Sequence, residues 1–141
     1  MRISIALILA FLMGSPVTAR AEVDTPSELG GARVLSAEEL HGLAARSDLR
    51  IYDLRKKASF VEGHIPGAIS AARHYDAVAE KLDTSFLGAA KAAPIVFYSH
   101  GVAGWKSYWA AKAAIEAGYT NVMWFRGGYA EWEEKALPIK R

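Results

Sequence analysis

The sequence predicts an α/β fold in which helices cover both faces of a mostly parallel sheet. Segments with strand-like patterns alternate with segments with helix-like patterns, and the loops between them are short, which is typical of βα units. The most distinct strand, Ile95–Tyr98, leads into a glycine-containing loop and then into an alanine-rich helix. The chain has 141 residues, 52% of them hydrophobic, so we expect one domain with a substantial core.

The N-terminal stretch is interpreted separately from the domain. Arg2 precedes a mainly apolar run from Ile3 to Met13, which is followed by Gly14, Pro16 and the small-residue site Ala19-Arg20-Ala21. This order of features predicts a signal peptide over residues 1–21 that is cleaved after Ala21, and a periplasmic or secreted protein. A membrane anchor is the weaker interpretation, because a spanning helix needs about 20 apolar residues.

Charge and cysteine content exclude several functions. Removal of residues 1–21 lowers Lys+Arg from 17 to 15 against 15 Asp+Glu, which leaves no net charge on the mature chain. Such a chain gives no electrostatic reason to expect nucleic acid or an anionic membrane as a partner after cleavage. The sequence has no cysteine, so it forms no disulfide and offers no thiolate as nucleophile or metal ligand.

The elements follow one another in chain order, from a loose arm over residues 22–31 into a domain over 32–141. Ser36 and Glu39 have the spacing of a capping box, which predicts the start of the first helix. The other elements are expected as a strand over 33–35, the first helix to about Ala45, a strand over Leu49–Leu54, a helical turn at Ala58–Phe60, a turn at Gly63–Gly67, a strand over Ala68–Ser70, a helix over Tyr75–Leu82, a helix over Trp105–Ala117, a strand over Asn121–Phe125 and a helix over Tyr129–Lys135.

The loop Ser99–Gly104 is the candidate site. The first turn of a helix has amide N–H groups without helical partners and carries a partial positive charge. A glycine-containing loop in front of such a helix makes a cradle of the size of an anion, and Lys106 and Ser107 could add donors. The pattern indicates an oxyanion or a small sulfur-containing anion as ligand.

Several motifs occur together in the order of one known family. Asp53-Leu54-Arg55 is followed by Gly63-His64-Ile65-Pro66-Gly67-Ala68, and the C-terminal half contains Trp105-Lys106-Ser107 and Arg126-Gly127-Gly128-Tyr129. This arrangement, from about Val34 to Pro138, resembles the rhodanese family. The resemblance implies a three-layer α/β fold with a five-stranded sheet and sulfurtransferase ancestry.

The resemblance fails at the residue on which the family's chemistry depends. Active rhodaneses carry a cysteine in this loop, whose thiolate accepts sulfur as a persulfide. Counting from the strand end puts that position at Ser99, and counting back from Trp105 puts it at Gly101. A related exported subgroup has two cysteines, which map onto Ser99 and Gly104.

We therefore expect a rhodanese-like domain without sulfurtransferase activity that binds an anion or a partner protein and needs no cofactor. The expected binding loop consists of Ser99, His100, Gly101, Val102, Ala103, Gly104, Trp105 and Lys106. One alternative is an enzyme, either a thiosulfate-type sulfurtransferase by an atypical route or a hydrolase that uses Ser99 and His100. Another is a purely structural domain.

The remaining candidates have both a functional and a structural interpretation. Asp53 and Arg55 either order the loop or form an ion pair that ties the strand end to a turn. His64 is expected to serve its turn, and the histidines lack the spacing of metal ligands. Lys106 is either an anion contact or a solvated side chain, and Trp105 is the aromatic candidate for a pocket wall.

Overall fold

The computed structural model describes residues 22–141, and the expected signal peptide lies outside the described residues. Thirteen short elements make up this described part of the chain. The strands are β1 (Ala32–Val34), β2 (Arg50–Asp53), β3 (Ala68–Ser70), β4 (Tyr75–Asp76), β5 (Lys81–Leu82), β6 (Ile95–Tyr98) and β7 (Val122–Phe125). The helices are α1 (Ala37–Leu43), α2 (Lys57–Glu62), α3 (Trp105–Glu116) and α4 (Gly128–Glu134), with 3-10 turns η1 (Ala72–His74) and η2 (Thr84–Leu87).

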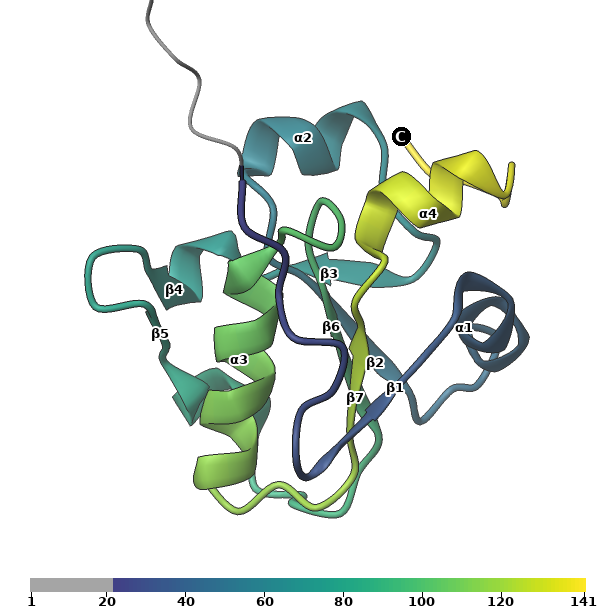
Figure 1. Ribbon diagram of the computed structural model, residues 1–141. Helices are drawn as coiled ribbons and strands as arrows, with labels where there is room; N and C mark the ends of the chain where they lie inside the picture. The colour runs from purple at the N-terminus through teal and green to yellow at the C-terminus, as the bar shows by residue number, and fades with distance from the viewer. Residues whose placement is uncertain (1–21) are drawn as a thin grey trace, which may run out of the picture.

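The main sheet has five strands in the order β1-β7-β6-β2-β3, and all four pairings are parallel. Helix α3 covers one face, while α1 and α4 lie together on the other (Figure 1). The α/β class and the five-stranded sheet with helices on both faces are thereby confirmed. Because parallel strands have their carboxyl ends at one edge, the residues that follow β2, β6 and β7 are brought together there.

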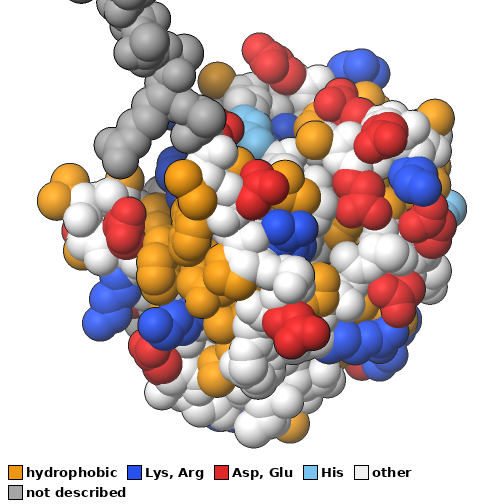
Figure 2. Space-filling model, viewed as in Figure 1, with side chains coloured by type: hydrophobic (Ala, Val, Ile, Leu, Met, Phe, Trp, Pro, Cys, Tyr) orange, Lys and Arg blue, Asp and Glu red, His pale blue; other side chains and the backbone are white. Residues whose placement is uncertain are grey.

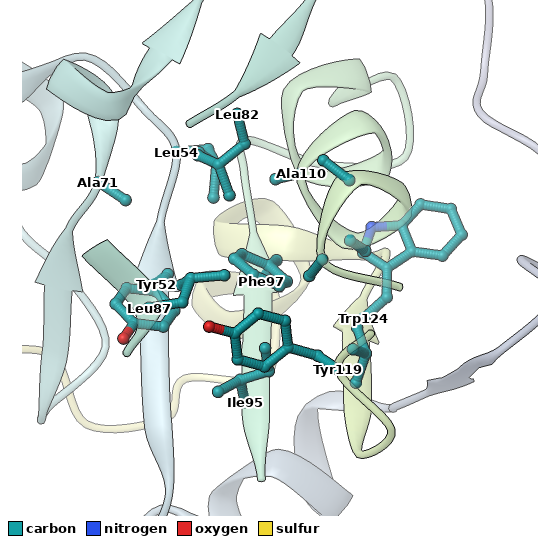
Figure 3. Close-up of a cluster of buried hydrophobic side chains, with 14 residues drawn as sticks. Tyr52, Leu54, Ala71, Leu82, Leu87, Ile95, Phe97, Ala110, Tyr119 and Trp124 are labelled. Atoms are coloured by element: carbon teal, nitrogen blue, oxygen red, sulfur yellow. The ribbon is translucent and has the colours of Figure 1, made fainter. Parts of the chain in front are cut away.

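The two faces of the sheet carry two separate cores. On the α3 face, Phe97 and Trp124 pack against Ala110 and its neighbours on the helix (Figure 3). On the other face, Tyr98 and Phe125 pack with Leu40 of α1 and Trp132 of α4. Strand residues alternate between the two cores as the pleat requires, which explains why β6 and β7 are buried along their whole length.

The capping box of α1 is confirmed. The Glu39 amide donates to Ser36 Oγ at 3.1 Å, and the Ser36 amide donates to Glu39 Oε2 at 2.8 Å. These two bonds satisfy amide groups that the first helical turn leaves without partners.

The prediction of a helix over Tyr75–Leu82 is wrong. The segment forms a two-stranded antiparallel hairpin in which β4 pairs with β5. The Asp76 carboxylate accepts hydrogen bonds from the amides of Val78 at 2.8 Å and Ala79 at 3.0 Å, and this local turn competes with helix formation. Val78, which the helical spacing placed on an apolar face, is 97% exposed.

The N-terminal arm is not loose, which corrects the expectation for residues 22–31. Thr25 is 3% exposed, and both its amide and its hydroxyl donate to the Val102 carbonyl, at 2.8 and 2.6 Å. Arg126 donates to the carbonyls of Thr25 and Pro26 at 2.7 and 2.9 Å. The arm therefore crosses the molecule next to the candidate loop and runs alongside α3 (Figure 1).

The outer surface of α3 is aromatic at its first two turns. Trp105, Tyr108 and Trp109 are in mutual contact, with ring centroids 5.0 to 5.7 Å apart. Figure 2 shows apolar side chains gathered over α3 on this face. Within residues 22–141, no helix has the length and apolar character needed to cross a membrane.

Candidate functional site

The candidate loop follows β6 at the carboxyl edge of the sheet and is held by the start of α4. The amides of Tyr129 and Ala130 donate to the carbonyls of Ser99 and His100 at 2.9 and 2.8 Å. Gly128 makes this approach feasible, because its φ is +59° and a Cβ atom there would lie 2.5 Å from the Ser99 carbonyl oxygen. The Arg126–Gly128 turn thus belongs to the site, although the sequence indicated only a turn.

The direction of the loop peptides decides which amides are available to a ligand. In a trans peptide the C=O and the following N–H point in opposite directions, so the amides of His100 and Gly101 are directed away from α4. The amides of Gly104 and Trp105, by contrast, donate to the carbonyls of Gly101 and Ala103 at 2.8 and 3.0 Å. Part of the expected cradle is therefore used to close the loop on itself.

A cavity of about 660 Å³ opens beside the loop. Residues from the arm, the loop and α4 line it, namely Glu22, Asp24, His100, Gly101, Val102, Ala103, Gly104 and Ala130. Partial desolvation of the ring, followed by the positive charge of Arg55, lowers the pKa of His100 below its ordinary value. The lowered pKa favours the neutral imidazole at pH 7, and Glu22 and Asp24 of the arm are the acidic residues among the described lining.

Ser99 follows the last residue of β6 directly, and it is not among the residues that line this cavity. It is 2% exposed, and a Cβ atom on Gly104 would lie 2.8 Å from its Cβ. Gly101, the other candidate for the nucleophile position, does line the cavity. Ser99 and Gly104, onto which two cysteines of the related subgroup map, are therefore neighbours in space.

Ser99 and His100 differ in their exposure to solvent. Ser99 is buried under the loop, whereas His100 is exposed on the cavity side. Within residues 22–141, the hydrogen bonds of histidine rings involve His64 and His74, and none joins Ser99 Oγ to the His100 ring. A nucleophile needs its base within hydrogen-bond reach, so nothing in this arrangement supports the hydrolase alternative.

Asp53 and Arg55 form a buried ion pair beneath the loop. The Asp53 carboxylate accepts from Arg55 at 2.6 Å and from the Tyr98 hydroxyl at 2.6 Å, and Arg55 also donates to the Gly63 carbonyl at 2.7 Å. The pair thus ties the end of β2 to the Gly63 turn, as the structural interpretation predicted. Tyr129 covers the guanidinium at 3.9 Å, so the same cluster also supports α4.

Burial and neighbouring charges shift the pKa values of Arg55 and Tyr98 in this cluster. Burial alone opposes the charge of Arg55, but the hydrogen bonds and the charge of Asp53 outweigh it and raise the pKa of Arg55. Burial, together with the Asp53 charge, raises the pKa of Tyr98 far above its ordinary value. Tyr98 consequently stays a phenol and remains a hydrogen-bond donor, which the sequence motifs did not indicate.

The first turn of α3 contributes less to the cavity than expected. The Ser107 hydroxyl donates to the Gly104 carbonyl at 2.9 Å and accepts from Trp124 Nε1 at 3.0 Å, so it is a structural group and not a ligand donor. Trp105 donates from Nε1 to the Val23 carbonyl at 2.8 Å and holds the arm. Trp105 and Lys106 are both absent from the cavity lining, and Lys106 Nζ lies 5.9 Å from the Tyr75 ring centroid.

The other histidines have structural partners. His64 Nδ1 lies 2.9 Å from the Phe60 carbonyl oxygen, and its ring stacks on Phe60 at 3.8 Å. His41 meets Trp132 edge-on at 5.8 Å. Within the described part of the chain, no group of three or more His, Cys, Asp or Glu side chains is arranged to hold a metal ion.

The fold and the site define a class of protein. It is an α/β domain with a parallel five-stranded sheet, in which a loop joins a central strand to the start of a helix. The rhodanese-like domain family matches residues 36–135, and the chain belongs to that family. Human thiosulfate:glutathione sulfurtransferase is 29% identical over 115 residues, a match that covers 76% of this chain and 98% of the human protein.

Solved structures show the same fold. A protein of Anabaena sp. superposes with a TM-score of 0.60 at 22% identity over 75% of this chain and 90% of its own. A thiosulfate sulfurtransferase from Pseudomonas aeruginosa gives 0.59 at 22% identity, over 78% of this chain and 20% of that longer protein. A protein of Bacillus halodurans gives 0.62 at 21% identity, covering 77% of each chain.

Proposed function

We propose that this protein is an exported rhodanese-like domain that does not transfer sulfur and that uses the cavity beside the loop as a binding site. The chain has no cysteine, and a serine follows the strand where the family's chemistry needs a thiolate. A serine hydroxyl is a weak nucleophile unless a base activates it, and its oxygen does not carry persulfide sulfur. The absence of cysteine is the observation on which the non-catalytic part of the proposal rests.

The charges of the cavity favour a group of a partner protein over a small free anion as the occupant. Glu22 and Asp24 are among the lining residues, and the lowered pKa of His100 favours its neutral form at pH 7. Cleavage after Ala21 gives Glu22 an α-ammonium group that offsets one of these carboxylates. The negative charge that remains attracts an ammonium or guanidinium group and disfavours a free oxyanion. The amides of His100 and Gly101, which point away from α4, support an oxyanion as the second candidate ligand.

The non-catalytic part is tested by sulfur transfer from thiosulfate to cyanide. We expect the wild-type protein to match the uncatalysed rate, and Ser99→Ala to change nothing. Turnover by the wild-type protein that Ser99→Ala abolishes would show that the protein is an enzyme. Ser99→Cys and Gly101→Cys test whether the loop still supports sulfur transfer when a cysteine is present. Activity in one variant alone identifies which of the two positions corresponds to the family's nucleophile.

The ligand class is tested by amide chemical shifts of the loop in titrations with sulfate, with thiosulfate and with a short lysine-containing peptide. The proposal expects the peptide to shift the amides of His100 and Gly101 and expects Asp24→Asn to weaken the effect. Shifts from sulfate that Asp24→Asn strengthens would identify the cavity as an anion site.

Export is supported by the order of charged, apolar and small residues over 1–21. It is tested by sequencing the N-terminus of the protein recovered from the cell envelope or the medium. We expect Glu22 as the first residue, and recovery of the uncleaved chain from the cytoplasm would refute export.

A further inference from the structure

A second cavity lies along the outer edge of the sheet, at β3. It measures about 840 Å³ and shares no lining residue with the cavity beside the loop. It is lined by Lys57, Phe60, Ala68, Ile69, Ser70, Ala72, Arg73, His74 and Phe86. We call these residues the β3 groove. The expected site residues contribute nothing to it.

The backbone of β3 offers this groove hydrogen-bonding groups that pair with nothing else among residues 22–141. β3 is the last strand of the sheet and pairs with β2 on one side. The Ala71 amide donates to the Asp53 carbonyl at 2.9 Å, so the alternation of a parallel ladder turns Ile69 and Ala71 toward β2. The N–H and C=O of Ser70 consequently point outward, where an added strand would bond to them.

The side chains around this edge form an apolar floor. Ile69 is 48% exposed, although it lies in a strand and is strongly apolar. Phe60 and Phe86 are half-buried, and each is fixed by a stacked histidine, with ring centroids 3.8 and 3.9 Å apart. An exposed apolar residue on an open strand edge is a feature that proteins usually cover.

The rim of the groove is positively charged. Lys57 and Arg73 are exposed, and within residues 22–141 neither takes part in an ion pair. His74 accepts a hydrogen bond from Arg73 Nε at 3.0 Å, and no carboxylate of the described residues lines the groove. A second copy of this chain would bring the same cations face to face, so self-pairing along β3 is disfavoured.

We propose that the β3 groove binds an extended acidic segment of a partner protein. The segment adds a strand to β3 through the Ser70 backbone. Its apolar side chains lie on Ile69 and the two phenylalanines, and its carboxylates meet Lys57 and Arg73. Backbone pairing supplies affinity, while the charges select an acidic sequence over a basic one.

The test uses a short fluorescein-labelled peptide that alternates glutamate and valine, and a counterpart with lysine in place of glutamate. Fluorescence anisotropy measures binding, and amide chemical shifts locate it. We expect the acidic peptide to bind and to shift the amides of Ile69 and Ser70. Lys57→Glu and Arg73→Glu should each weaken binding about tenfold, whereas the lysine peptide should not bind wild-type protein.

Lys112→Glu is the matched control, because it reverses an exposed charge on α3 and should leave the affinity unchanged. Failure of the acidic peptide to bind at millimolar concentration overturns the proposal. The proposal is also overturned if both charge reversals have no effect, if acetate alone shifts the same amides equally, or if the shifts grow with protein concentration without peptide. Because the two cavities are separate, none of these results affects the function proposed for the loop.

Discussion

Asp53 accepts hydrogen bonds from two residues at once, and this makes it the residue on which the buried cluster depends. The carboxylate accepts from Arg55 and from Tyr98, and all three side chains are nearly inaccessible to solvent. Removal of one partner of a buried ion pair leaves a charge without compensation, which costs far more than the loss of one neutral donor.

Asp53→Ala should therefore destabilise the protein by about 3–5 kcal/mol, against about 1.5–3 kcal/mol for Tyr98→Phe. Urea unfolding followed by tryptophan fluorescence measures both free energies. Equal losses for the two variants would mean that the Arg55 charge is compensated by other groups.

A second prediction at the residue scale concerns alkaline pH. Burial, assisted by the charges of Glu80 and Asp76, raises the pKa of Tyr75 to about 12. The folded state therefore favours the neutral phenol, and the resulting stability is fully present below the unfolded pKa of about 10. It is lost as the pH rises toward about 12.

Tyr75→Phe should flatten the decrease in urea midpoint between about pH 10 and 12. Midpoints measured at stepped pH for the variant and the wild-type protein test this. Parallel curves for the two proteins would show that other groups control alkaline unfolding.

At the scale of elements, the contact between the loop and α4 depends on the absence of a side chain at Gly128. This residue combines a positive φ with a close carbonyl oxygen. Gly67 also has a positive φ, of +84°, but a Cβ atom there would meet nothing within 4 Å. Alanine variants at the two glycines therefore distinguish the cost of backbone strain alone from the cost of strain together with a steric clash.

Gly67→Ala should cost about 1–2 kcal/mol through its backbone conformation, and Gly128→Ala should cost clearly more. Hydrogen exchange of the Tyr129 and Ala130 amides should accelerate in Gly128→Ala alone. Similar stability and exchange in both variants would contradict the role assigned to this contact.

The arm is the second element-scale feature, and Arg126 is its main attachment. Arg126→Ala removes the donors to Thr25 and Pro26, so the Thr25 amide should exchange faster with solvent while the unfolding free energy changes little. Arg33→Ala is a suitable control, because it removes an exposed cation from a surface ion pair. Unchanged exchange at Thr25 would show that Val102 and Trp105 hold the arm without Arg126.

The elements also show what the sequence could predict. The strands β2, β6 and β7, the capping box and the parallel sheet follow from local pattern and were predicted within a few residues. The hairpin at Tyr75–Leu82 was missed because the Asp76 side chain bonds its own neighbouring amides, and helical spacing does not register this competition.

The place of the candidate loop in the fold was predicted, but the contacts that hold it were not. The motifs located the loop and the Asp53–Arg55 pair. They could not indicate that Thr25 and Arg126, 101 residues apart, meet beside the loop, because that contact depends on the tertiary fold. Burial of Ser99 depends likewise on how the loop closes over it.

At the scale of the whole molecule, the small residues of α3 set the distance between the helix and the sheet. The face of α3 toward the sheet consists largely of alanines, and Ala110, Ala111 and Ala114 are fully buried. Such a face lets the helix lie close to Phe97 and Trp124 (Figure 3).

Ala110→Leu should overpack this layer and destabilise the protein by about 1–3 kcal/mol, whereas Lys112→Leu on the exposed side should be nearly neutral. Thermal unfolding of both variants makes the comparison. A neutral Ala110→Leu would show that the α3 layer has spare volume.

The placement of Ser99 has a consequence for how reactivity can change in this scaffold. The buried ion pair, the start of α4 and the arm hold the loop through backbone carbonyls and neighbouring residues, and the Ser99 hydroxyl contributes to none of these contacts. A serine and a cysteine differ there by one atom. Exchange of Ser99 for cysteine should therefore preserve the contacts that hold the loop, whichever of Ser99 and Gly101 occupies the nucleophile position.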